Sequence, residues 1–334
     1  MTVLAWGLIG AGDIARKRIA PALRDLANCD LVSVSRARSD LAEDFVREFG
    51  ARKWFADWRE LIADDEIDAV YIATPVDLHA AQTIVSAEAG KHILCEKPMA
   101  LSVKECDAMI AACRTNNVKL GIAYYRRYYP LIGRVKEIVG SGEIGRVSVI
   151  QINAFEFFDP PLHHPRRWLL DRTKSGGGPM MDFGCHRIEI LMYLFGAIRR
   201  TEAIISSNIF SREVEDTASV LLKFENGASA TVTVTHAANE PQDTLNIFGT
   251  KGSIHVPVLN QGGMTIMASA GEREEFHPPA ANIHQPLIES FAASILGNSI
   301  PEVDGEIGRR VAKVIEDIYE KGKTPIGSAI TADN

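Results

Sequence analysis

Two short strings of the sequence place acidic and basic side chains where they could move a proton. Asp182 and His186 are four residues apart, so on a helix they share one face. A carboxylate beside an imidazole can raise the pKa of the imidazole and fix its orientation. Glu96 and Lys97 follow an apolar run that is predicted to be a strand, and the lysine could donate a hydrogen bond to an oxygen atom of a substrate. Lys97, Asp182 and His186 are therefore candidates for proton transfer, with the proton donor left open between Lys97 and His186.

Each of these groups also has a structural interpretation. Glu96 and Lys97 could form an exposed ion pair, and His186 could be a helix-capping or core histidine. No metal centre is predicted, because neither an HExxH pattern nor a third ligand at metal spacing accompanies Asp182 and His186. Three glycines, 176–178, precede the pair and are expected to let the backbone pass close to a ligand.

A glycine pattern near the start of the chain predicts a dinucleotide site. The apolar run Leu4–Ile9 leads into Gly10, Gly12 and Ala15, which fit G-x-G-x-x-A between a strand and a helix. The first glycine permits a tight turn, and the second lets the backbone approach a pyrophosphate at the helix N-terminus. The alternative is a purely structural turn. The predicted cofactor-binding residues of this loop are Gly10, Gly12, Asp13 and Ile14.

The end of the second predicted strand bears on the choice of cofactor. Leu31–Val34 is followed by Ser35, Arg36 and Arg38, where NAD-binding units usually carry an acid for the ribose 2′-OH. Arg36 can stack on the adenine or bind a 2′-phosphate, and Ser35 and Arg38 can add hydrogen-bond donors. These residues predict NADP(H) in preference to NAD(H). A solvated basic loop is the alternative.

Polar residues follow a further buried strand. Thr74 and Pro75 come at the end of Ala69–Ala73, and His79 lies just beyond them. Ligands of open parallel sheets bind outside the carboxyl ends of the strands. Thr74, Pro75 and His79 are therefore predicted to face the cofactor, on the same edge as Glu96 and Lys97.

The elements that position these residues change in character along the chain. Up to about Gly121, short apolar runs alternate with amphipathic segments such as Leu41–Phe49 and Ala80–Ala89, which predicts a doubly wound parallel sheet of α/β class. A capping box at residues 102–105 begins a helix that extends through Cys113. The other runs predicted as strands here are Leu31–Val34, Ala69–Ala73, His92–Cys95 and Lys119–Ile122.

The second half of the chain predicts an α+β domain with a largely antiparallel open sheet. Asn226 and Gly227 form a hairpin signal between two of its strands. Helices are expected over Met181–Phe195 and along an apolar face from Ile307 to Ile318 that ends at Gly322. The predicted strands are Val147–Phe157, Ala203–Ile209, Ala218–Phe224, Ala228–Val234, Leu245–Phe248 and Ser253–Val256. We expect domains at 1–123 and 124–334, joined through Tyr124–Pro130.

Composition excludes several classes of protein. The 334 residues are 46% hydrophobic and 24% charged, which is typical of a globular protein and argues against disorder. A net charge of −7 makes nucleic acids and anionic membranes poor partners. Five cysteines without a CxxC pair, and no signal-peptide pattern, predict a cytoplasmic protein with reduced thiols. The longest apolar run, Ile190–Ile198, is too short to span a bilayer.

The order and spacing of these strings resemble a known family. Gly7–Ala15, Ala73–His79, Gly90–Pro98 and Gly176–His186 are together similar to the Gfo/Idh/MocA oxidoreductases, over nearly the whole chain. The resemblance implies a Rossmann domain followed by an α+β domain whose open sheet carries subunit contacts, and hence a homodimer or homotetramer. It also implies that Lys97, Asp182 and His186 are catalytic, that Glu96, Lys97 and Thr74–His79 line the cofactor, and that Pro98 follows a cis bond.

Substrate contacts are the least defined part of the resemblance. It places Tyr125, Arg127 and Trp168 near the substrate, with Asp182 and His186, although packing is the alternative role of the first three. Leu169 and Leu170 follow Trp168 where relatives often have an arginine, so the substrate is left open.

The predicted function is an NADP(H)-dependent oxidoreductase of a sugar, polyol or related carbonyl compound. One alternative is a regulator that senses a dinucleotide or sugar without turnover, although such a protein need not keep proton-transfer groups. The other is a hydro-lyase or glycosidase that uses transient oxidation by bound NAD.

Overall fold

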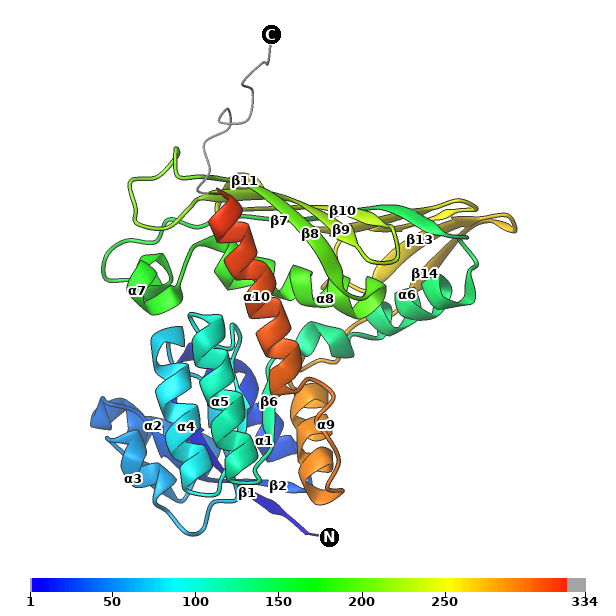
Figure 1. The fold of residues 1–334 in the computed structure, drawn as a ribbon. Coiled ribbons are helices and arrows are strands. Elements are labelled where there is room, and N and C mark those ends of the chain that lie inside the picture. The colour runs from blue at the N-terminus through cyan, green and yellow to red at the C-terminus, as the bar shows by residue number, and fades with distance from the viewer. Residues whose placement is uncertain (1, 323–334) are drawn as a thin grey trace. The chain divides into compact units, whose positions relative to one another are not determined.

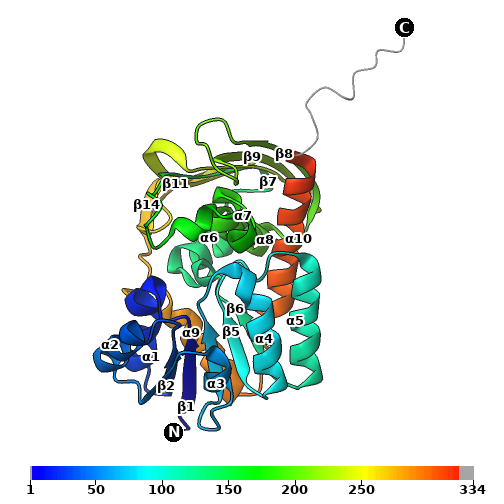
Figure 2. The same cartoon turned by 90° about the vertical axis from the view of Figure 1, so that its left-hand side faces the viewer.

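The chain folds into two compact units. The computed structural model describes residues 2–322 (Figures 1 and 2). The first unit comprises Met1–Tyr129 and Pro279–Ala312, and the second comprises Pro130–Pro278 and Lys313–Asn334. The predicted first domain ends at residue 123, and the predicted second domain includes residues 279–312. The structure instead divides the chain after Tyr129 and returns 279–312 to the first unit. Residues 323–334, also assigned to the second domain, lie outside the described residues.

The first unit contains the predicted parallel sheet, which has six strands where the sequence indicated five. The strand order is β3-β2-β1-β4-β5-β6, and every pair in it is parallel. β1, β4 and β5 read as continuous apolar runs because helices cover both faces of the sheet. β3 was not predicted, because its three residues are only half-buried and form no apolar run. The strands are β1 Leu4–Ile9, β2 Cys29–Ser35, β3 Lys53–Phe55, β4 Ala69–Ile72, β5 His92–Cys95 and β6 Leu120–Ile122.

Helices connect these strands near their predicted positions. At the start of α5, Ser102 Oγ accepts the backbone N–H of Glu105 at 3.2 Å, which is one half of the predicted capping box. The carboxylate of Glu105 accepts instead from the backbone N–H of Leu101, at 2.9 Å. The helical elements of this unit are η1 Ala15–Ile19, α1 Ala20–Asp25, α2 Ser39–Phe49, α3 Trp58–Ile62, η2 Val76–Leu78, α4 His79–Glu88, α5 Val103–Thr115, η3 Tyr125–Tyr128 and α9 Gln285–Leu296.

The helix α9 explains why residues 279–312 belong with the first unit. Its residues Leu287, Ile288 and Phe291 are buried in the core of the parallel sheet. The ring of Phe291 lies 6.0 Å from the ring of Trp6 in β1. A Cβ on Gly121 in β6 would lie 2.6 Å from Phe291 Cδ2, so glycine makes room for this ring. The apolar face of α9 therefore completes a core that the first 129 residues leave open.

The second unit is built on an eight-stranded sheet. Its order is β14-β13-β12-β11-β7-β10-β9-β8, in which only the β7–β10 pair is parallel. The hairpin predicted at Asn226 and Gly227 joins β9 to β10, and Gly227 has a φ of 91°. β13 and β14 were not predicted. The strands are β7 Val147–Phe157, β8 Ile198–Ser206, β9 Thr217–Phe224, β10 Ser229–Thr235, β11 Ala237–Gly249, β12 Ser253–Val256, β13 Gly263–Ala268 and β14 Gly271–Phe276.

Helices cover one face of this sheet and leave the other open. α6 and α8 lie against one face in Figure 1, and β9 accordingly alternates buried and exposed residues. α10 begins in the first unit and ends in the second. The helical elements are α6 Pro130–Ser141, η4 Arg167–Leu170, α7 Arg172–Ser175, η5 Met180–Gly184, α8 Cys185–Phe195 and α10 Gly305–Gly322.

The described residues bear on the expectations about membrane-spanning segments and about the cysteines. None of the helices in residues 2–322 has the length and apolar character needed to cross a membrane. All five cysteine side chains are buried thiols, and no disulfide joins them.

Candidate active site

The glycine loop after β1 has the backbone that its sequence pattern predicts. Gly10 has a φ of 95°, and a Cβ there would lie 2.7 Å from the carbonyl of Ala73 at the end of β4. At Gly12 a Cβ would meet nothing nearer than the Gly10 oxygen at 4.0 Å. The turn therefore requires glycine at position 10. At Gly12 the missing side chain leaves space for a ligand to approach the protein backbone. This arrangement fits the pyrophosphate of a dinucleotide.

The residues after Gly12 begin the first helix. Asp13 is exposed and pairs with Lys17 at 3.0 Å, and Ile14 is 37% exposed. Ala15 is fully buried against the sheet, where a small side chain lets the helix pack closely. The first turn of this helix, Ala15–Ile19, has π geometry. Asp13 and Ile14 are accessible on the helix surface.

Arg36 lies over the glycine loop. Its Nη1 donates to the carbonyl oxygen of Ala11 at 2.7 Å. Burial lowers the pKa of the Arg36 guanidinium, and the positive charges of Arg16 and Arg38 lower it further. Arg16 is paired with Glu48 and Arg38 with Asp40, whereas Arg36 has no carboxylate partner within ion-pair distance among the described residues, so a phosphate could bind it without displacing one.

Arg38 and Ser35, the other predicted cofactor-binding residues after β2, differ in what they can offer a ligand. Arg38 is exposed and pairs with Asp40 at 2.7 Å, so a phosphate would have to compete with that carboxylate. Ser35 is buried, and its carbonyl accepts the N–H groups of Gly10 and Ala11 at 3.0 and 3.3 Å. Ser35 therefore holds the glycine loop through its backbone.

His79 joins two loops at the carboxyl edge of the sheet. Its Nε2 lies 3.0 Å from the carbonyl oxygen of Thr74, and its Nδ1 lies 3.0 Å from that of Pro98. Thr74 Oγ1 donates to Gln82 at 2.6 Å, and Pro75 precedes η2. Burial lowers the pKa of His79, and the two carbonyl oxygens, which can only accept hydrogen bonds, oppose this shift. The structure thus gives His79 a bridging position, and its contact with a cofactor stays a prediction.

Glu96 is buried, so the exposed-ion-pair interpretation is wrong for this residue. Its carboxylate accepts the hydroxyl of Tyr71 at 2.9 Å and the backbone N–H of Lys97 at 3.2 Å. His284 Nε2, from the returning segment, lies 3.3 Å away. Burial raises the pKa of Glu96, but His284, Lys97 and Tyr71 together outweigh it and bring this pKa below its ordinary value. The ionised Glu96 holds the backbone beside Lys97, where the Lys97–Pro98 bond is cis as expected.

Asp182 and His186 lie at a junction between two kinds of helix. Asp182 is in the π-turn η5, and His186 is a buried residue in the first turn of α8. The sequence predicts a continuous helix over Met181–Phe195, and the structure places a π-turn at its start. Such turns are frequent at functional sites. Arg166 Nη2 donates to Asp182 Oδ2 at 3.4 Å. Both residues belong to the second unit, whereas Lys97 belongs to the first.

Of the three glycines before this junction, one ends a helix and two are required by packing within the chain. Gly176 has a φ of 82° and ends α7. A Cβ on Gly177 would collide with the hydroxyl of Tyr319, and a Cβ on Gly178 with the carbonyl oxygen of Glu215. A side chain at Gly177 or Gly178 would thus clash with the chain itself, and the close passage of a ligand at these glycines stays a prediction.

Glu215 is a buried anchor that sequence reasoning missed. Its carboxylate accepts the N–H groups of Gly178 at 2.8 Å and Met180 at 3.1 Å, and the hydroxyl of Tyr319 at 2.8 Å. Burial raises the pKa of Glu215, and these three donors oppose the shift. The contacts fix the start of η5 and hence the position of Asp182. No spacing signal links Glu215 to the glycines, since only the fold brings them together.

Substitution of this anchor should destabilise the second unit. Glu215→Gln places an amide NH₂ against a backbone N–H, so we expect a loss of about 1–3 kcal/mol in the free energy of unfolding. Chemical denaturation of both proteins measures it. Glu213→Gln is the matched control, because Glu213 is exposed two residues away and should change stability by less than about 0.5 kcal/mol. Equal stability of the Glu215→Gln variant and the wild type would contradict the anchoring role.

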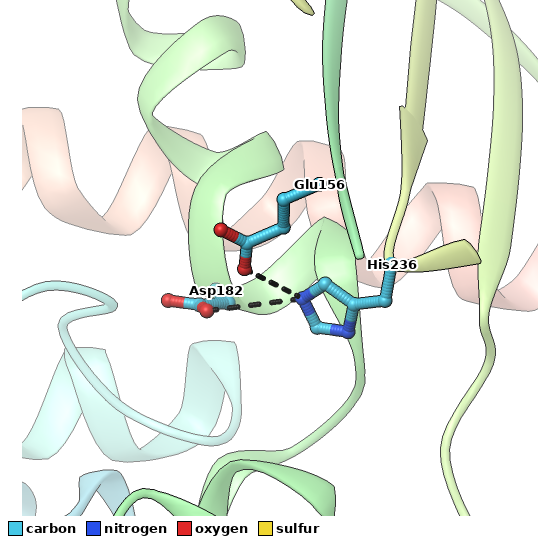
Figure 3. A group of neighbouring side chains, drawn as sticks. All are labelled: Glu156, Asp182 and His236. Carbon is cyan, nitrogen blue, oxygen red and sulfur yellow. Dashed lines mark ion pairs between the residues drawn. The ribbon is translucent and has the colours of Figure 1, made fainter. Parts of the chain in front are cut away.

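Glu156, Asp182 and His236 form a cluster that the sequence analysis did not identify (Figure 3). His236 Nε2 lies 3.7 Å from Glu156 Oε1 and 3.9 Å from Asp182 Oδ2. One ligand atom from each residue lies within 4.8 Å of the others, a spacing at which a metal ion could be considered. The three residues come from separate segments, so no linear motif reports them.

The predicted substrate contacts have packing roles in this structure. The ring of Tyr125 stacks on His284 at 4.5 Å, and Arg127 Nη1 donates to the carbonyl of Glu302 at 3.4 Å. Trp168 packs on a small apolar cluster that includes Phe158. Substrate binding by Tyr125, Arg127 and Trp168 stays a prediction.

Comparisons with known proteins agree with this geometry. Residues 4–124 match the oxidoreductase family with an NAD-binding Rossmann fold, and residues 132–255 match the GFO/IDH/MocA C-terminal domain. The chain is 32% identical to mouse trans-1,2-dihydrobenzene-1,2-diol dehydrogenase over 83% of its own length and 80% of the relative's. It is 29% identical to 1,5-anhydro-D-fructose reductase of Ensifer adhaerens over 91% of each chain. A levoglucosan dehydrogenase solved with NADH and levoglucosan superposes with a TM-score of 0.88 at 28% identity, covering 96% of this chain and 97% of the other.

Proposed function

The chain belongs to the Gfo/Idh/MocA family of oxidoreductases, and from this premise we propose that it transfers a hydride between NADP(H) and a sugar, polyol or related carbonyl compound. The observation that carries the proposal is the glycine loop shaped for a dinucleotide, in a chain that has Asp182 and His186 on η5 and α8 and Lys97 just after β5. The names of the relatives, which include a reductase of an anhydro sugar and a dehydrogenase of a cyclic diol, support a polyhydroxylated substrate.

The chain's own residues would handle the proton and the position of the substrate. The nicotinamide, when bound, supplies or accepts the hydride. Lys97 and His186 hydrogen-bond the reacting oxygen, and one of them transfers its proton. Asp182 orients the imidazole and contacts a neighbouring substrate hydroxyl.

Arg36 supports NADP(H) as the preferred cofactor. No acid follows β2 at the position where a ribose 2′-OH is usually bound, and Arg36 is held over the loop by Ala11. The neighbouring Arg16 and Arg38 are paired with Glu48 and Asp40, so a 2′-phosphate would meet Arg36 first.

A substrate panel tests the function directly. Aldoses, polyols, anhydro sugars and aldehydes would be offered with NADPH or NADP⁺, and the absorbance of NADPH followed. We expect turnover with at least one polyhydroxylated compound. Tight binding of NADPH with no turnover across the panel would favour a sensor. Conversion of a sugar with no net change in the cofactor would favour a hydro-lyase or glycosidase.

The open face of the second sheet predicts self-association. Val149, Ile204, Leu221 and Met267 are each between 42% and 59% exposed, and the strand register places all four on the face that lacks helices. An apolar sheet face of this kind favours burial against a second copy. We expect light scattering to give a dimer or tetramer at micromolar concentration. A mass near 36.6 kDa would contradict this expectation, and Leu221→Glu should shift an oligomer towards that mass.

A further inference from the structure

The ring of His236 is buried and fixed from several sides. It follows β10 and lies 5.1 Å, centroid to centroid, from each of the rings of Phe158 and Phe183. Its backbone N–H donates to Asp216 at 2.9 Å, and its carbonyl accepts from Phe158 at 2.9 Å. The side chain is fully buried. His236 therefore presents the same edge of its imidazole to the cluster unless its neighbours also move.

Arg212 determines which ring nitrogen of His236 carries the proton. Its Nη2 lies 3.3 Å from His236 Nδ1. A guanidinium can only donate, so Nδ1 must accept, and the neutral imidazole carries its proton on Nε2. Burial lowers the pKa of His236 to about 4, although the charge of Asp182 opposes this shift. The ring is therefore neutral near pH 7, in the Nε2–H form.

This tautomer decides between two uses of the cluster. The Nε2–H group faces Glu156 Oε1 and Asp182 Oδ2 (Figure 3). A metal ion would need a lone pair on Nε2, and the proton would then have to sit on Nδ1 against the Arg212 guanidinium. Arg166 already donates to Asp182, which further reduces the attraction for a cation. The arrangement therefore favours an N–H group facing two carboxylates over a metal site.

We propose that His236 is a positioning residue for the proposed reaction: its Nε2–H, fixed by Arg212, faces the carboxylates of Asp182 at 3.9 Å and Glu156 at 3.7 Å and favours their charged forms. The inference rests on the proposed role of Asp182. The charged groups that face His236 and Asp182 from the surrounding segments are Glu156, Arg166, Arg212 and Asp216.

The tautomer can be measured without any substrate. In protein with ¹⁵N-labelled histidine, the ring signals of His236, assigned by their loss in His236→Gln, should show a protonated Nε2 and an unprotonated Nδ1 near pH 7. The opposite tautomer would overturn the proposal. A shift of both signals on adding Zn²⁺ or Mn²⁺, lost in Glu156→Gln, would also overturn it in favour of a metal site.

Two substitutions distinguish the loss of the Nε2–H donor from the loss of the imidazole ring itself. The amide nitrogen of His236→Gln can occupy the position of Nε2 and still donate towards Asp182. His236→Asn reaches only the position of Nδ1, so it keeps a partner for Arg212 but lacks that donor. An N–H facing a carboxylate favours its charged form, so without it the pKa of Asp182 should rise.

The expected result is a difference in the pH profile of kcat. In His236→Asn the acidic limb should move to higher pH, with kcat near pH 7 lowered by roughly tenfold, while His236→Gln should stay within about threefold of the wild type. A merely structural role would lower the melting temperature of both variants and leave the limb in place. An unchanged limb in His236→Asn would overturn the proposal, provided that Asp182→Asn is inactive. Full turnover in Asp182→Asn would instead refute the proposed role of Asp182, and the labelled-histidine experiment would still report the tautomer.

Discussion

Lys97→Ala and His186→Ala are each expected to lower kcat by roughly 10²–10⁴, the usual contribution of general acid–base catalysis. The two residues are proposed to act on one reacting oxygen, so their losses should not add. The double variant should therefore keep about the same residual rate as either single variant. Steady-state kinetics on the substrate found by the panel measures all three rates.

Stability and cofactor binding separate this result from a general loss of folding. The melting temperature and the NADPH dissociation constant should change little in Lys97→Ala, because Lys97 is only half-buried. Lys104→Ala, an exposed lysine at the start of α5, is the matched control and should retain wild-type kcat. Wild-type turnover in Lys97→Ala would end the proposed mechanism. A His186→Ala protein that loses stability but keeps kcat would assign His186 to the core.

Removal of Arg36 should weaken NADPH binding by about tenfold to a hundredfold, since a charge-assisted hydrogen bond contributes about 1.5–3 kcal/mol. NADH lacks the 2′-phosphate, so its affinity should fall far less in Arg36→Ala. Titration of both cofactors by fluorescence measures the four dissociation constants. The exposed Arg47 on α2 provides the control, and Arg47→Ala should bind NADPH as the wild type does. Equal affinities of the wild type for NADH and NADPH would refute the cofactor assignment.

The parts of the fold that could be predicted are those with a local signal. β1, β5 and β7 have the predicted bounds because each is rich in apolar residues that favour strands. The hairpin was predictable because its turn needs a positive φ at Gly227, which glycine adopts without strain. The packing of α9 in the first unit was not predictable. An apolar helix face can cover either sheet, and only the tertiary contact with Trp6 shows which one it covers.

The residues of the candidate site also differ in whether a local sequence signal predicts their position. Gly10, Arg36 and Glu96 follow strands directly, so the strand–helix pattern predicts where they lie. Glu215 and His236 have no such relation to the residues they serve. Glu215 reaches the glycines through hydrogen bonds from a distant loop, and His236 meets Asp182 only after β7, β10 and η5 have come together. Contacts formed by tertiary packing leave no periodicity or spacing in the sequence.

The return of Pro279–Ala312 to the first unit has a consequence for the order in which the nascent chain can fold on the ribosome. Synthesis proceeds from the N-terminus, and domains generally fold as they emerge. All six strands of the parallel sheet have been made by Ile122, yet the helix that covers Trp6 is not translated until residue 285 and beyond. Throughout the synthesis of the second sheet, the dinucleotide-binding half therefore exposes an apolar face that chaperones could bind. Its folding is completed only near the end of translation, after the second sheet has been made.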